Sequence, residues 1–148
     1  MANLPPFQFH EDSVLGVVDR TTALDVGKDV NWCPQRVRLW RMFKILLDIY
    51  DHSLGTDTPA GKGKGTSRGI NEGNGYGVEL QEFEMYCVPN AGDCGATLPL
   101  ASVQLPGVDT AMWTEVAERD RLVALGYTVQ TLQYCYIWDP ALYQKCIP

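Results

Sequence analysis

Residues 35–51 read Gln-Arg-Val-Arg-Leu-Trp-Arg-Met-Phe-Lys-Ile-Leu-Leu-Asp-Ile-Tyr-Asp, and they decide the fold of the chain. This is the longest dense apolar segment, so the core has to be built against it. At about 100° per residue, the charged side chains of positions 38–51 gather in one arc and apolar side chains fill the rest. The pattern predicts a central, mostly buried helix, with Pro34 at its start and Gly55 shortly after its end.

A pair of strands is the alternative for the same segment. Its odd-numbered positions are mostly apolar, whereas its even-numbered positions mix charged with large apolar side chains. A hairpin broken near Met42-Phe43-Lys44 would divide the segment into two strands. The helix predicts an α+β domain with a small antiparallel sheet and extended arms, and the hairpin predicts an all-β sandwich with one C-terminal helix.

Length and composition indicate one globular domain. The chain has 148 residues, of which 45% are hydrophobic and 20% are charged. Its net charge of −6 argues against nucleic acid as a partner, because phosphate binding needs a basic face. The N-terminal residues lack the charged and apolar regions of a secretory signal, and no segment is typical of a membrane span. We therefore expect synthesis in the cytoplasm and no membrane partner.

The five cysteines give no metal-binding or redox motif, because no two of them are spaced as Cys-x-x-Cys. Without a secretory signal, reduced thiols are the expectation. The alternative is that Cys87 and Cys94 pair across a short loop, if the protein meets an oxidising medium after assembly.

Two segments are set apart from the predicted domain core. Residues 1–12 form a predicted arm, in which Phe7 and Phe9 are apolar anchors at strand spacing, and residues 13–148 form the domain. Residues 52–77 hold eight of the 14 glycines, which predicts a flexible or partner-clamped loop.

The rest of the chain predicts short strands and a second helix. Asp109 or Thr110 can cap a helix that Gly126 ends. The stretch 94–108 is predicted to be a connection, since Pro99 and Pro106 limit regular structure. The predicted strands are 14–18, 76–80, 83–88 and 127–138.

No catalytic or metal-binding pattern emerges. Gly55-x5-Gly61-Lys62-Gly63 has one residue too many for a phosphate-binding loop, and glycine replaces its hydroxyl residue. The only two histidines, His10 and His52, have no ligand or nucleophile at a useful spacing. Carboxylates such as Glu79 and Glu115 are typical of a solvated surface. We expect no enzyme activity, no cofactor and no metal.

Several motifs resemble a known structural family. Residues 15–18, 34–39, 75–78 and 85–88 read Leu-Gly-Val-Val, Pro-Gln-Arg-Val-Arg-Leu, Gly-Tyr-Gly-Val and Met-Tyr-Cys-Val. In that order they resemble the transthyretin-like or carboxypeptidase-regulatory-like β-sandwich modules of bacteriophage virion proteins, over about residues 13–92. The resemblance implies an all-β, immunoglobulin- or transthyretin-like sandwich with a structural role. The chain departs from it by a longer loop at 52–75 and by the lack of a turn signal between Leu39 and Ile45.

These observations predict a structural subunit of a larger assembly, and specifically a phage virion component. A capsid-decorating (cement) protein or a tail or neck protein fits best, with other copies or virion neighbours as partners. The alternative is a carbohydrate- or ligand-binding module whose surface aromatic rings stack on the ligand. In a third interpretation, the same aromatic rings belong to the hydrophobic core. The predicted interface residues are Phe7, Phe9, Lys62, Lys64, Arg68, Tyr134, Tyr136 and Trp138.

Overall fold

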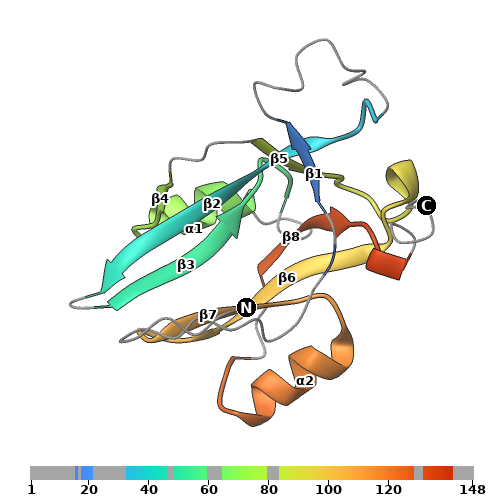
Figure 1. Ribbon diagram of the computed structural model, residues 1–148. Coiled ribbons are helices and arrows are strands. Elements are labelled where there is room, and N and C mark those ends of the chain that lie inside the picture. Colours follow the sequence, from blue (N-terminus) through green and yellow to red (C-terminus); the bar gives the residue numbers. More distant parts are fainter. Residues whose placement is uncertain are drawn as a thin grey trace, which may run out of the picture.

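The computed structural model describes residues 16, 18–21, 33–46, 49–59, 65–79, 84–128 and 132–141. Within these ranges the chain has a mixed, mostly sheet fold of two antiparallel sheets and two α-helices (Figure 1). One sheet has the strand order β1-β5-β2-β3, with β4 also paired to β2, and the other has the order β7-β6-β8. The strands are β1 (Asp19–Thr21), β2 (Val37–Leu46), β3 (Ile49–Gly55), β4 (Gly77–Val78), β5 (Glu84–Cys87), β6 (Leu98–Leu105), β7 (Asp109–Trp113) and β8 (Leu132–Ile137). The helices are α1 (Ser67–Gly73), α2 (Val116–Ala124) and the short 3₁₀ helix η2 (Asp93–Gly95).

The predicted central helix is wrong, because residues 35–51 contribute to a β-hairpin. β2 pairs with β3 from Trp40 opposite Gly55 to Leu46 opposite Ile49. The hairpin alternative placed a break near Met42, but the register runs through Met42 without a shift.

Tertiary partners explain why this segment is extended. Arg38 forms a 2.9 Å ion pair with Glu84 of β5, and Lys44 Nζ donates a 2.7 Å hydrogen bond to the carbonyl oxygen of Asn74. Met42, between them, is fully buried. Arg38, Met42 and Lys44 of the even-numbered face are therefore accommodated by different surroundings, and tertiary contacts override the local helical pattern.

The glycine-rich stretch is not one open loop. It includes the last residues of β3, helix α1 and β4. Thr66 caps α1 by accepting a 3.0 Å hydrogen bond from the backbone N–H of Gly69. The prediction of a continuous loop over 52–77 is therefore wrong for these parts, and residues 60–64 lie outside the described residues.

The predicted connection at 94–108 is also wrong, because it contains β6, the middle strand of the second sheet. Pro99 lies opposite Tyr136 of β8. The backbone N–H and C=O of Tyr136 bond instead to Val88, at 2.8 and 3.1 Å. Proline has no backbone N–H to donate. Because the backbone groups of Tyr136 bond to Val88, Pro99 fits here without the loss of a hydrogen bond between β6 and β8.

The second helix and the later strands are predicted in part. β5 and β8 lie within the predicted strands 83–88 and 127–138, and β4 lies within 76–80. Gly126 follows α2 with φ +105°, which confirms the predicted stop. The helix begins at Val116 and not at Asp109 or Thr110, because Asp109–Trp113 pairs with β6 as β7. Of the predicted strand 14–18, residues 16 and 18 are described and neither is in a strand.

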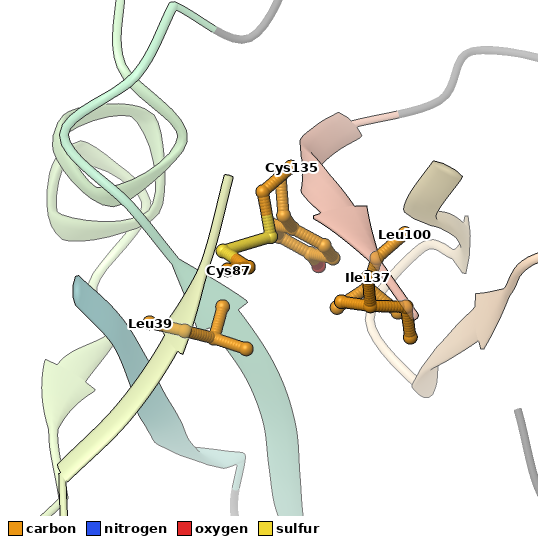
Figure 2. Close-up of a cluster of buried hydrophobic side chains, with 6 residues drawn as sticks. Leu39, Cys87, Leu100, Cys135 and Ile137 are labelled. Atoms are coloured by element: carbon orange, nitrogen blue, oxygen red, sulfur yellow. A yellow bond between two sulfur atoms is a disulfide. The ribbon is translucent and has the colours of Figure 1, made fainter. Parts of the chain in front are cut away.

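The two sheets meet in a buried core that a disulfide crosses (Figure 2). Leu39 and Cys87 come from the first sheet, and Leu100, Cys135 and Ile137 come from the second. The disulfide joins Cys87 of β5 to Cys135 of β8, 48 residues apart, and a second disulfide joins Cys33 to Cys94. Both cysteine expectations are therefore wrong for the four described cysteines: they are paired and not reduced, and Cys87 does not pair with Cys94.

Candidate interaction surface

Next to the turn of the β2–β3 hairpin, one face carries exposed apolar side chains. Successive residues of a strand point to opposite faces, and Ser53 bonds Tyr134 of the second sheet at 2.8 Å. Tyr50 has the opposite parity and therefore lies on the other face of β3. Ile45 is its cross-strand neighbour, and the two side chains are 60% and 62% exposed.

Phe43 extends this surface, because its ring centroid lies 6.4 Å from that of Tyr50. We call Phe43, Ile45 and Tyr50 the hairpin patch. Adjoining exposed apolar side chains of this kind are typical of interaction sites, whereas scattered ones are not. The helical interpretation placed all three residues inside a buried helix. The apolar odd-numbered positions were the available signal for Phe43 and Ile45 but not for Tyr50.

The hairpin patch adjoins an open sheet edge. Among the described residues, β3 pairs only with β2. The carbonyl oxygen of Leu54 accepts a 2.7 Å hydrogen bond from Asn71 Nδ2, so it points away from β2. Tyr50 and His52 have the same parity as Leu54, and their backbone groups therefore point to the same edge. An edge of this kind can accept a strand from a partner.

A second cluster surrounds Trp40 at the other end of the hairpin. The guanidinium carbons of Arg38 and Arg68 lie 5.4 and 4.4 Å from the Trp40 ring centroid. Arg68 also donates a 2.8 Å hydrogen bond to Glu72, which raises the pKa of Arg68 above its usual value. Arg68, a predicted interface residue, is thus already engaged within its own chain.

The other predicted interface residues are not brought together. Phe7, Phe9, Lys62 and Lys64 lie outside the described residues. Tyr134 is 1% exposed, and its hydroxyl bonds Ser53 and Ser102, both at 2.8 Å. The interpretation of Tyr134 as a surface ring is therefore wrong, and the core interpretation holds for it.

Tyr136 and Trp138 are half-buried and have structural contacts. Both pack against the buried cluster of Cys33, Val88 and Ala96. The indole N–H of Trp138 donates a 2.9 Å hydrogen bond to the carbonyl oxygen of Cys94, next to the Cys33–Cys94 disulfide. These rings hold η2 against the second sheet, which leaves less of their surface for a ligand.

The described part of the chain shows neither a metal-binding cluster nor a membrane-spanning helix. It contains no group of three or more His, Cys, Asp and Glu side chains that could hold a metal ion. Its helices include none that is long and apolar enough to cross a membrane. His52 is exposed, with its Nδ1 3.9 Å from Glu79 Oε2.

The fold and this surface define a two-sheet antiparallel domain with an exposed apolar hairpin. No family model matches the chain, and no curated protein or solved structure matches it significantly.

Proposed function

We propose that the chain is a structural subunit of a larger assembly and that copies of it associate through the β2–β3 hairpin. The observation that carries the proposal is the exposure of Ile45 and Tyr50 on one face, beside an edge of β3 that no described strand covers. Burial of such side chains is favourable by about 1.5–3 kcal/mol each. A second copy is the occupant we infer, because an apolar patch is complementary to itself and a two-fold contact needs only one patch.

The assembly we propose is a bacteriophage virion, in which the chain is a capsid-decorating protein or a tail or neck component. Two observations support this. The packing of two antiparallel sheets through Leu39 and Ile137 is the arrangement implied by the resemblance to virion β-sandwich modules. The two disulfides suit a particle that leaves the reducing cell interior after it is assembled.

Sedimentation velocity at increasing protein concentration tests the association. We expect the wild-type chain to form oligomers and the variant Ile45→Lys/Tyr50→Lys to stay monomeric, because two charges on the hairpin patch oppose its burial. The matched control is Val116→Lys/Leu125→Lys. It places two charges on similarly exposed apolar positions at the two ends of α2, its first residue and its C-cap, 53% and 63% exposed, and should behave as wild type.

Two results would refute the proposal. One is a wild-type chain that stays monomeric at every concentration. The other is a hairpin variant that oligomerises as wild type does while its thermal unfolding is unchanged.

A further inference from the structure

A polar pocket of about 220 Å³ lies between the β2–β3 hairpin and the β6–β7 turn, which Figure 1 shows one above the other. Lys44 and Asp51 line it from the hairpin, and Tyr76 lines it from the segment before β4. Gln104 of β6 and Asp109 of β7 close the other side. The volume is smaller than the roughly 300–1,000 Å³ of pockets for drug-sized ligands, so the pocket suits a small molecule or a single side chain.

Asp51 is a buried carboxylate with one unused oxygen. The residue is only 5% exposed. Its Oδ2 accepts hydrogen bonds from the hydroxyl of Tyr76 and from Thr110 Oγ1, the latter at 3.0 Å. Its Oδ1 is buried and has no hydrogen-bond partner among the described residues. A buried carboxylate is normally paired with a cation or fully hydrogen-bonded, so Asp51 is prepared for a donor that the described residues do not supply.

Lys44 would be the expected partner but is directed elsewhere. It lies directly across the ladder from Asp51. Its Nζ instead donates a 2.7 Å hydrogen bond to the carbonyl oxygen of Asn74 and lies 5.7 Å from the centroid of the Tyr76 ring. Within the described part of the chain, no Lys, Arg or His nitrogen lies within 4.0 Å of the Asp51 carboxylate.

The charges of the lining favour a positively charged ligand. Two carboxylates, Asp51 and Asp109, face one ammonium group, Lys44, so the lining has a net charge of −1. Asp109 accepts a hydrogen bond from the Tyr127 hydroxyl, which leaves its charge uncompensated. An anion would have to approach the buried Asp51 carboxylate, whereas a cation would neutralise it.

We propose that this pocket binds a small organic cation, whose ammonium or guanidinium group donates a hydrogen bond to Asp51 Oδ1. Because Oδ1 has almost no accessible surface, a lining side chain must move before the donor reaches it. Lys44 is the long, flexible side chain of this wall, and an incoming cation repels its ammonium group toward solvent. The pocket is separate from the hairpin patch, because Asp51 and Tyr50 point to opposite faces of β3.

Isothermal titration calorimetry tests the proposal with two probes. One is agmatine, a free molecule with a guanidinium and an ammonium group. The other is a short capped peptide of Gly and Ser residues around one Arg. Binding of agmatine alone assigns the site to free small cations, and tighter binding of the peptide assigns it to a partner's basic side chain. Failure of both probes to bind the wild-type chain would overturn the proposal.

Variants test the role of the carboxylate and the sign of the charge. We expect Asp51→Asn to weaken binding at least tenfold, because it removes the negative charge that attracts the cation. We expect Lys44→Met to strengthen binding, because it removes a positive charge that repels the cation. Asp120→Asn, an isosteric change at an exposed position of α2, should leave binding unchanged. Equal binding by the Asp51→Asn variant, or weaker binding by the Lys44→Met variant, would contradict a cation site.

Thermal unfolding separates binding from a framework role for Asp51. A neutral amide costs less to bury without a partner than a carboxylate does, so Asp51→Asn should unfold at the same or a higher temperature than wild type. A lower midpoint for this variant, together with unchanged binding by the Lys44→Met variant, would assign Asp51 to the framework and refute the site.

Discussion

Removal of the Cys87–Cys135 disulfide should lower the free energy of unfolding by several kcal/mol. The two residues are 48 apart in sequence, for which the loop-closure relation gives about 4 kcal/mol from chain entropy. Both side chains also lie in the inter-sheet core, 0% and 2% exposed. Replacement by alanine removes one buried sulfur from each, at about 1 kcal/mol per site by analogy with one buried methyl group.

The expected total of about 6 kcal/mol is a large part of the roughly 5–15 kcal/mol that stabilises a typical domain. The double variant Cys87→Ala/Cys135→Ala should therefore be marginally folded. Urea unfolding followed by tryptophan fluorescence measures the change. The slope of unfolding free energy against urea should also increase, because an uncrosslinked unfolded chain exposes more surface.

The comparison variant is Cys33→Ala/Cys94→Ala, which removes the other disulfide. Its separation of 61 residues predicts a similar loss from chain entropy, about 4 kcal/mol. It should be less destabilised overall, because Cys94 is only half-buried. An unchanged free energy and slope for Cys87→Ala/Cys135→Ala would refute the reasoning. So would peptide mapping that finds Cys87 joined to a different cysteine.

Three further changes probe the packing and the buried hydroxyls. Gly55→Ala should lower the free energy of unfolding by about 1–3 kcal/mol in urea, because its Cβ would lie 2.5 Å from a buried methionine sulfur. Tyr134→Phe should lower it by about 1–3 kcal/mol, since two buried serine hydroxyls lose their shared partner. Burial first, and then a hydrogen bond to a carboxylate, raises the pKa of Tyr76 from 10.0 to about 12. A raised tyrosine pKa contributes stability that is complete below pH 10 and is lost as the pH rises through about 12, which the pH dependence of thermal unfolding and the ultraviolet titration of the phenol should both show.

Each of these changes has a control in the same chain. Gly77→Ala should be tolerated better, because a Cβ at Gly77 meets nothing within 4 Å. Tyr50→Phe removes the hydroxyl of a 62% exposed ring and should change stability little. Tyr76→Phe should remove one tyrosine titration at high pH, and with it the part of the alkaline loss of stability that this titration causes. Equal losses for Gly55→Ala and Gly77→Ala, or for the two tyrosine changes, would contradict the packing described.

Local signals in the sequence predicted the elements that depend on a few neighbouring residues. Gly126 ends α2 in a left-handed conformation that favours glycine, as the sequence predicts. The dipeptide Asn74-Gly75, a sequence typical of turns, forms a turn before β4, and Gly75 has φ +92°. β5 was predicted by alternation alone. These features depend on no distant contact, so the neighbouring residues are enough to predict them.

Sequence reasoning failed where two periods fit the same residues. Residues 35–51 match a helical wheel and, at their odd-numbered positions, a strand. Contacts with residues distant in sequence favour the strand over the helix, such as those of Glu84 with Arg38 and of Asn74 with Lys44. β6 was missed for a related reason: Pro99 argues against a strand unless the backbone of Tyr136 bonds elsewhere.

The sequence by itself determined the acidic charge of the chain and the stop of its second helix, because these follow from composition and local conformation. Only the tertiary structure decided that the apolar segment is a hairpin, which cysteines pair, and which side chains are left unsatisfied. It exposed Ile45 and Tyr50 beside the hairpin turn and enclosed Asp51 with one oxygen unpartnered. The pocket at Asp51 is lined by residues of both sheets, and such contacts have no signature in any single stretch of the chain.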